Sequence, residues 1–278
     1  MDWRDEGILL SVAEHGESSA IIDVLTSSHG RHPGLVRGGQ GAKLAAALQP
    51  GTELSLEWRA RLEDHLGNYR VEPVKSRAAQ LMENRAALAA FGAMSALLIA
   101  FVPERQPDYE LYEASHDLLV DLAERPRDWP GTYLRWEATF LGLMGFGLDL
   151  SSCAATGRRR DLAYVSPRTG RAVSREAGGP FAEKLLPLPP FLAGEGVVTM
   201  AGVRSGLEMT GWFLDNRLRP AMEREAPLPE ARNRLLRQFD RMELPARSAA
   251  QPGATLAPQP DRRADVWNRR LGTSRQAS

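Results

Sequence analysis

The chain has 278 residues, of which 43% are hydrophobic and 25% are charged, and its formal net charge at pH 7 is zero. This composition excludes collagen-like and wholly disordered proteins, and the balanced charge means that any nucleic-acid site depends on uneven charge distribution. The length leaves room for two folded units and a tail.

Cysteine content and hydropathy bear on the cellular compartment. Cys153 is the single cysteine, so no intramolecular disulfide can form, and the segment Met1–Glu6 lacks the apolar core of a secretory signal. The longest apolar run, Ala87–Val102, is interrupted by Gly92 and Ser95 and falls short of the roughly 18 to 20 residues that cross a bilayer. We expect a cytoplasmic protein without a membrane partner.

The first 75 residues predict five strands, because short apolar runs alternate with Gly, Pro, His and Ser. The predicted strands are Gly7–Glu14, Ser19–Thr26, Gly34–Arg37, Glu53–Leu62 and Asn68–Val74. In the fourth strand, apolar and polar residues alternate with the period of a strand that has one buried face. Five such strands fit a small barrel, and periodicity does not separate an OB barrel from an SH3-like one.

From about residue 79 the apolar period becomes helical. A helix buried over most of its circumference, with Leu88 among its apolar positions, should end at Pro103. A third helix should begin near Gly131 and stop at Gly145-Phe146-Gly147. The other helices predicted from the same period are Tyr109–Arg125, Ser205–Arg224 and Pro229–Leu244.

The segment after Ala246 is rich in Ala, Pro, Gln, Arg and Ser and lacks the apolar content to offset its ordering entropy. We expect a disordered tail over residues 246–278, with Trp267 in a short stretch that can form a transient helix or a docking motif.

A carboxylate-free stretch of 29 residues between Asp23 and Glu53 is locally basic and rich in glycine. Arg31, Arg37 and Lys43 lie in it, and they would line a phosphate-binding groove if the flanking strands form a barrel. The alternative is a flexible, solvated hairpin. Charge by itself does not decide between these two interpretations.

A second basic cluster lies between residues 155 and 175, where six arginines and one aspartate give a local charge of +5. It begins with Arg158, Arg159 and Arg160. Such a run is either a nucleic-acid contact or a solvated face. Residues 79–126 have a local charge of −5 and are not expected to touch DNA.

Catalytic patterns are poorly supported. None of the five histidines has a spacing with another His, Cys or carboxylate that defines a zinc or hydrolase motif. The glycines at Gly38-Gly39-Gln40-Gly41 lack the strand, lysine and helix order of a phosphate loop. A nuclease would need clustered carboxylates, and Asp2-Asp5-Glu6 and Glu63-Asp64 are more typical of solvated surface charge. We therefore expect no enzyme activity.

The order of short motifs resembles the RecO family over roughly residues 6 to 243. The motifs that carry the resemblance are Glu6–Val12, Gly16–Ala20, Ser28–Arg31, Gly34–Gly38, Leu48–Gly51 and Gly145–Leu150, with Cys153 directly after the last.

The resemblance implies an α+β fold in which a five-stranded OB-type barrel precedes a mainly helical domain. We place the barrel at residues 1–78 and the helical domain at residues 79–245. It also implies a protein of DNA repair and recombination, associated with the nucleoid, that binds single- and double-stranded DNA and anneals complementary strands. The implied partners are RecR, the C-terminal tail of single-stranded DNA-binding protein and, indirectly, RecA.

Many members of the family carry a four-cysteine zinc site that would fall within residues 148–178 here. Only Cys153 is present, Thr156 stands where a second ligand would be, and the later pair falls in Val173–Ala177, which has no cysteine. We predict a degenerate zinc loop that binds no metal, in a protein without cofactors. Packing of its apolar residues and a hairpin turn at Ser166–Gly170 should keep its shape.

Matched to the family motifs, the DNA-binding role is carried to Arg31, Arg37 and Lys43, and Arg158, Arg159 and Arg160 are further candidates. An apolar groove rimmed by arginine would suit the acidic tail of a single-strand binding protein. Arg217, Arg219 and Arg224 are the candidates for that groove. An adaptor whose barrel binds only protein is the alternative function.

Overall fold

The computed structural model describes residues 1–125 and 129–243 of the chain. These described residues form two compact units, the first within residues 1–129 together with Leu228–Leu235, and the second within residues 130–227 together with residues 236–243. The predicted tail at residues 246–278, including Trp267, lies outside the described residues.

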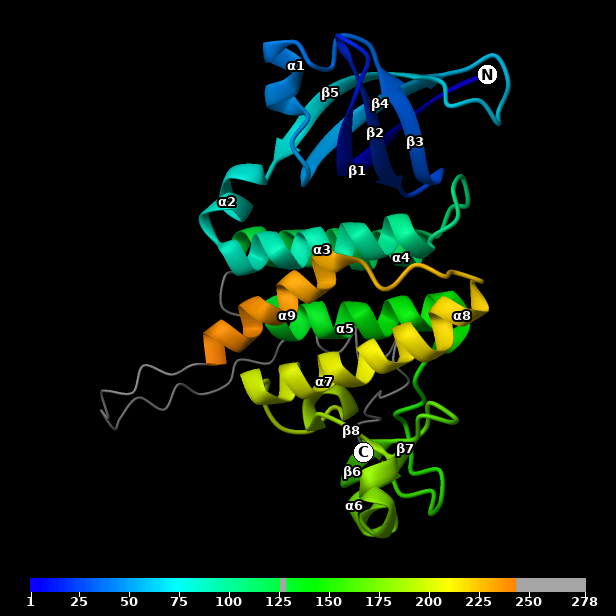
Figure 1. The fold of residues 1–278 in the computed structure, drawn as a ribbon, viewed down its shortest axis with the longest axis vertical. Coiled ribbons are helices and arrows are strands. Elements are labelled where there is room, and N and C mark those ends of the chain that lie inside the picture. Colours follow the sequence, from blue (N-terminus) through cyan, green and yellow to red (C-terminus); the bar gives the residue numbers. More distant parts are fainter. Residues whose placement is uncertain (126–128, 244–278) are drawn as a thin grey trace, which may run out of the picture. The chain divides into compact units, whose positions relative to one another are not determined.

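The first unit begins with a closed five-stranded barrel in the order β1-β2-β3-β5-β4 (Figure 1). All neighbouring strands are antiparallel except β3 and β5, and β1 closes the barrel by pairing with both β2 and β4. This is the OB-type barrel that was predicted. The strands are β1 (Asp2–His15), β2 (Ser19–Thr26), β3 (Gly30–Val36), β4 (Thr52–Arg59) and β5 (Asn68–Ser76).

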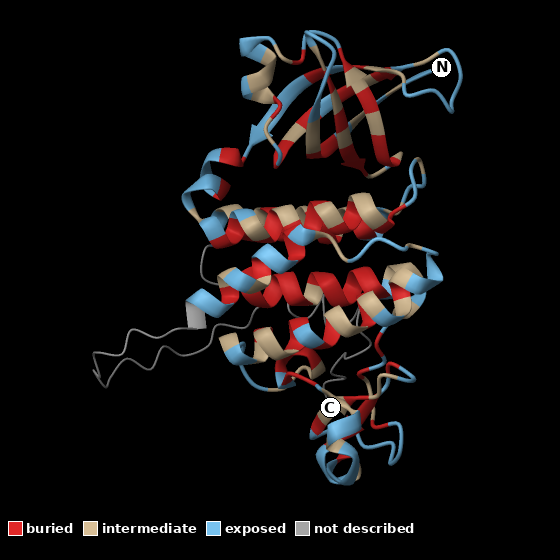
Figure 2. Cartoon of the chain, in the orientation of Figure 1, coloured by how far each residue is buried: buried red, intermediate tan, exposed pale blue. Residues whose placement is uncertain are grey.

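The alternating pattern of β4 sets the barrel interior. Leu54, Leu56 and Trp58 are almost fully buried, whereas the residues between them face outward. Figure 2 shows the resulting alternation of buried and exposed positions along the strands. The predicted fourth strand extended to Leu62, but β4 ends at Arg59, where the chain turns away toward β5.

A short helix, α1 (Ala42–Ala47), lies where the sequence suggested a groove-lining or flexible hairpin loop. Alanine has the highest intrinsic helix propensity, and four of the six residues of α1 are alanines, Ala42 and Ala45-Ala46-Ala47. Lys43 is therefore a helical residue, exposed on the first turn of α1.

Three helices follow the barrel in the first unit: α2 (Ala78–Glu83), α3 (Arg85–Phe101) and α4 (Tyr109–Glu124). The single long helix predicted before Pro103 is two helices, because the side chain of Asn84 caps α3 by accepting hydrogen bonds from the amides of Ala86 and Ala87 at 3.1 Å. Leu88, expected among the buried positions, is 42% exposed. Asp108 caps α4 in the same way through the amide of Leu111 at 2.9 Å.

Arg31 on β3 ties the barrel to the segment between α3 and α4. Its guanidinium donates to the Val102 carbonyl at 2.9 Å, to Asp23 on β2 at 2.7 Å and to Glu104 at 3.3 Å. The Arg31 carbonyl also accepts the amide of Arg105 at 2.8 Å. Burial raises the pKa of Asp23 and the adjacent Arg31 opposes that shift, so the carboxylate depends on this one cation.

A second ion-pair network joins the barrel to α2 and α4. Arg77, which precedes α2 and is almost fully buried, donates to Glu53 on β4 and, at 3.4 Å, to Glu124 on α4. His116 Nε2 lies 3.1 Å from the same Glu53 carboxylate, and Lys75 contacts Glu124 at 2.9 Å. Together with the Arg31 contacts, these ion pairs explain why the barrel and α2–α4 form one compact unit. The predicted domain boundary after residue 78 falls where the strands give way to helices, inside this compact unit.

The second unit is built on α5 (Trp129–Leu141), whose first residue belongs to the other unit, and on α7 (Met200–Phe213). A π-helical turn at Gly142–Phe146 ends α5, and Gly145 adopts a φ of +86° there. The predicted helix from residue 205 to 224 starts earlier, at Met200, because Thr199 caps it through the amide of Gly202. It continues through a π-helical turn at Leu214–Leu218 into α8 (Arg219–Ala221).

A small sheet in the order β7-β6-β8 lies between α5 and α7 in the sequence. The predicted turn at Ser166–Gly170 joins two of its strands and is closed by the Gly170 amide, which donates to the Ser166 carbonyl at 2.8 Å. The elements of this region are β6 (Leu162–Val165), β7 (Ala172–Ser174), α6 (Arg175–Gly178), β8 (Leu186–Pro187) and the 3-10 helices Gly179–Lys184 and Pro190–Ala193. The last described helix is α9 (Glu230–Glu243), which runs from the first unit into the second.

Removing Arg31 should destabilise the protein strongly. Arg31→Ala leaves the Asp23 carboxylate buried without its partner, and such a truncation costs about 3–5 kcal/mol of the free energy of unfolding. Arg37→Ala, an exposed arginine at the end of the same strand, should cost no more than about 0.5 kcal/mol. Urea unfolding of both variants measures the difference, and equal midpoints would show that the Arg31 contacts do not stabilise the unit.

Stability should also fall in mild acid because of His32. Burial lowers the pKa of this histidine from 6.5 to about 4, so the native state resists the proton that the unfolded chain accepts. The contribution of neutral His32 to the free energy of unfolding is therefore fully present above pH 6.5 and is lost progressively as the pH falls toward 4. The urea midpoint should drop more between pH 7 and pH 5 in the wild type than in His32→Asn. The same drop in both proteins would assign the effect to other groups.

Candidate nucleic-acid interface

The structure separates the three basic residues that were predicted to bind DNA on the barrel. Arg31 is 8% exposed, and its guanidinium is already bound by two carboxylates and a carbonyl. Such a group is not available to a phosphate unless the unit opens. In this structure Arg31 therefore stabilises the fold and is not accessible to DNA.

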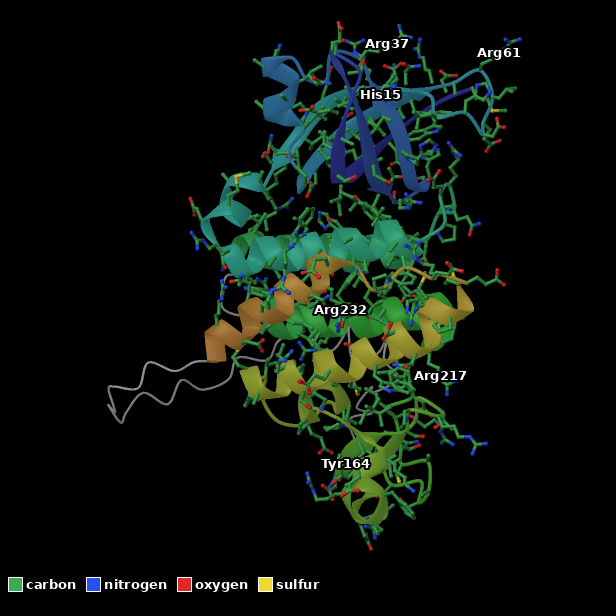
Figure 3. The ribbon with its side chains drawn as sticks, in the orientation of Figure 1. His15, Arg37, Arg61, Tyr164, Arg217 and Arg232 are labelled. Carbon is green, nitrogen blue, oxygen red and sulfur yellow. The ribbon has the colours of Figure 1, made fainter. Side chains whose placement is uncertain are left out.

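Arg37 and Lys43 lie at the surface. Arg37 follows β3, and its Nε donates to Asn68 Oδ1 at 3.1 Å, which leaves the terminal nitrogens of the guanidinium facing solvent. Lys43 makes no ion pair in the part of the chain that the structure describes. Both side chains are therefore accessible to a phosphate, and their DNA-binding role stays a prediction. Figure 3 shows Arg37 at the end of the barrel away from α3.

The degenerate zinc loop is held by hydrogen bonds around Cys153. The thiol is 1% exposed, and the amide of Ser174 donates to its Sγ at 3.2 Å. Burial raises the pKa of this thiol, but hydrogen bonds from Ser174, Thr156 and Ala155 outweigh burial and lower the pKa to about 6. Thr156, at the position expected for a second ligand, and Ser174, within the segment expected for the later pair, thus contribute hydrogen bonds to the one cysteine that is present.

The arginine cluster of this loop divides into paired and unpaired side chains. Arg158 contacts Glu176 at 2.5 Å, and Arg171 and Arg175 contact Asp149 and Asp161, each at 3.2 Å. Arg159, Arg160 and Arg168 are exposed and have no ion-pair partner among the described residues. Of the three predicted contacts here, Arg159 and Arg160 are therefore the most accessible, and Arg158 would have to leave Glu176.

Of the three arginines predicted to bind a partner, Arg217 lies in the π-helical turn after α7, Arg219 begins α8 and Arg224 lies just beyond the end of α8. Arg217 donates to the carbonyls of Pro167 and Arg168 at 3.1 and 2.8 Å and lies over the Trp212 ring, so it supports the β6–β7 turn. Arg219 pairs with Asp215 at 2.7 Å and also donates to the carbonyl of Arg224. Their partner-binding role stays a prediction.

Sequence reasoning gave no role to a surface hollow of about 240 Å³ on the barrel. Glu57, Arg59, Asn68, Tyr69 and Arg70 line it, from the facing strands β4 and β5. The alternation of β4 predicts which of its side chains point outward. It does not predict that these side chains lie near Arg70, because that proximity depends on the register between the strands.

Two further observations bear on the chemistry of the chain. The described part of the chain holds no group of three or more His, Cys, Asp or Glu side chains that could bind a metal ion. Within residues 1–125 and 129–243, no helix is both long and apolar enough to cross a membrane.

Zinc content tests whether the loop around Cys153 needs a metal. Because amides and hydroxyl-bearing residues surround the thiol, purified protein should contain much less than one zinc per chain, and its melting temperature should not change when EDTA is added. Elemental analysis and thermal unfolding measure both quantities. One zinc per chain, with a lower melting temperature after EDTA, would contradict this prediction.

Comparison with known proteins places both halves of the chain in one family. Residues 1–77 match the model of the recombination protein O N terminus, and residues 82–225 match the model of the recombination protein O C terminus. The DNA repair protein RecO of Ruegeria sp. (strain TM1040) is 54% identical over 236 residues, which cover 85% of this chain and 97% of that protein. The protein of the same name from Roseobacter denitrificans (strain ATCC 33942 / OCh 114) is 52% identical over 241 residues, 87% of this chain and 99% of its own. The chain therefore belongs to the RecO family of DNA repair proteins.

Proposed function

We propose that this chain is a non-catalytic mediator of DNA repair and homologous recombination. It binds single- and double-stranded DNA, anneals complementary strands and, with RecR, helps to load RecA onto DNA coated by single-stranded DNA-binding protein. The observation that carries the proposal is the match of both the barrel and the helical region to RecO.

The distribution of exposed cations supports DNA binding by a chain with no net charge. Arg37 and Lys43 lie on the barrel unit, and Arg159 and Arg160 lie on the second unit. All four side chains are exposed and have no carboxylate partner in the described ranges. Phosphates can therefore bind these side chains without first displacing an ion pair.

Annealing needs no bond chemistry in this mechanism. Two basic surfaces on one chain can each neutralise the phosphates of one strand, which lowers the repulsion between the strands and leaves their bases free to pair. Each neutralised phosphate of a single strand contributes about fivefold to affinity at 0.1 M salt. A few contacts per strand therefore suffice to hold two strands together.

The pairing of Arg219 fits a role in recognising an acidic protein tail. The side chains of Arg219 and Asp215 are 29% and 48% exposed, and exposed ion pairs of this kind contribute only about 0–1 kcal/mol. A carboxylate of a partner can therefore replace Asp215 at small cost. We propose that Arg219, with Arg217 and Arg224 beside it, contacts the tail of single-stranded DNA-binding protein.

Annealing of labelled complementary oligonucleotides precoated with single-stranded DNA-binding protein tests the proposal. The wild type should accelerate annealing, and both Arg37→Ala/Lys43→Ala and Arg159→Ala/Arg160→Ala should slow it by more than about fivefold, since each removes two cations from one surface. Arg85→Ala, an exposed arginine on α3, is the control and should match the wild type.

Two outcomes would count against this function. No acceleration by the wild type, together with no DNA binding at low salt, would favour the adaptor whose barrel binds only protein. Acceleration that all three variants retain would keep annealing but exclude both surfaces from it.

A further inference from the structure

Four arginines gather on the outer face of the barrel around the hollow described above. Arg4 on β1 and Arg70 on β5 both stand opposite Glu57 on β4. Arg59 is two residues along β4 from Glu57 and stands opposite Asn68, to which Arg37 is hydrogen bonded. We call Arg4, Arg37, Arg59 and Arg70 the arginine row.

The strand register points these side chains outward. Trp3, Trp58 and Tyr69 are sequence neighbours of the row and pack together toward the barrel interior, so the alternation of a strand directs Arg4, Arg59 and Arg70 to solvent. The side chains of Arg4 and Arg59 are 79% and 68% exposed, and Arg70 is also exposed. Diagonal neighbours on adjacent strands are about 7–8 Å apart, so the cations follow one another across the face.

Glu57 organises the row without neutralising it. Its carboxylate accepts hydrogen bonds from Arg59 at 2.6 Å and from Arg4 at 3.4 Å, and these bonds lower its pKa. The arginine members of these pairs are largely exposed, and ion pairs at the surface are weak, so phosphates can replace Glu57 as partners of both arginines. Arg70 has no ion-pair partner in the described chain.

An acidic border limits where a strand of nucleic acid can lie. The next outward positions toward the helices are Glu6, Ser55 and Glu72, which stand opposite one another on β1, β4 and β5. Two carboxylates there repel a phosphate backbone. A bound strand is therefore confined to the arginine row and crosses β1, β4 and β5 rather than running along them.

The aromatic groups nearest the row are not available to stack on bases. Trp3 is stacked against His29, with ring centroids 3.9 Å apart, and against Trp58, at 5.7 Å, and Trp58 and Tyr69 are themselves almost fully buried. Contact with a ligand must then come from the cations, which recognise phosphates rather than bases.

We infer that the arginine row is the track on which the phosphates of single-stranded DNA lie, with Arg59 and Arg70 as its central contacts. This inference rests on the proposed function and names the surface and the mode of binding. Because the cations bind backbone and nothing stacks on bases, the track should not distinguish dT20 from dA20, and its affinity should depend steeply on salt.

Fluorescence anisotropy with labelled dT20, using the full-length chain, tests the track. Arg59→Ala/Arg70→Ala should bind about 25-fold more weakly at 0.1 M salt, and the log–log salt slope should decrease by about 1.4, because two phosphate contacts are lost. Arg70→Ala and Arg85→Ala each remove one exposed, unpaired arginine of the first unit. Only Arg70→Ala should weaken binding, by about fivefold.

Glu57→Gln should change the affinity for dT20 in the opposite direction to the arginine variants. Removing a negative charge from the middle of a phosphate track should strengthen binding, whereas a variant that merely damaged the barrel would weaken it. Thermal unfolding should show nearly the same melting temperature for all these variants, since Arg59, Arg70 and Arg85 are exposed and Glu57→Gln keeps the size of a side chain whose printed ion pairs are with exposed arginines.

The outcomes separate this inference from the proposed function. Arg59→Ala/Arg70→Ala that binds like the wild type, while Arg37→Ala/Lys43→Ala or Arg159→Ala/Arg160→Ala loses affinity, would overturn the track and leave the mediator function in place. No binding of dT20 by the wild type at low salt would overturn both. Weaker binding by Glu57→Gln would also contradict the track.

Discussion

The buried guanidinium of Arg31 is the contact on which the first unit depends most. One side chain on β3 satisfies a carboxylate of the barrel, a carboxylate beyond α3 and the carbonyl of Val102. A buried charge is tolerated only when its partners are in place, so the barrel and the helices must assemble together. This dependence explains why a barrel that is continuous in sequence belongs to a compact unit extending to Trp129.

Burial also distinguishes arginines that stabilise the fold from arginines that are accessible to a ligand. Arg31 and Arg77 are buried and hold elements of the first unit to one another, whereas Arg59 and Arg70 lie on the outer face of the same barrel. The chain has no net charge, so a nucleic-acid surface can arise only where cations gather without matching carboxylates. The arginine row on the barrel meets that condition, because four arginines gather around the single carboxylate of Glu57, and the acidic border of Glu6 and Glu72 sets its limit.

The loop around Cys153 is held together by hydrogen bonds and packing, where many members of the family have four zinc-binding cysteines. Backbone amides and hydroxyl-bearing residues surround a single buried thiol, and a three-stranded sheet closes over the same segment. Hydrogen bonds to sulfur and the packing of β6 against β7 hold the hairpin together. The segment before β6 exposes Arg159 and Arg160, so this fold serves to present cations in the proposed function.

The sequence alone determined the order of the five barrel strands, the long helices and the family, but it missed the first five residues of β1, the first four of β3 and the strands β6–β8. Period-two alternation and glycine turns depend on local chemistry, and the predicted Ser19–Thr26 strand and Tyr109–Arg125 helix agree with β2 and α4 to within one residue. Local signals failed at Asn84, where a cap divides a long apolar helix. Only the tertiary structure decided which cations face solvent, because the partners of Arg31 and the neighbours of Arg70 come from distant segments. Those contacts depend on strand register and on helix docking, which no local pattern encodes.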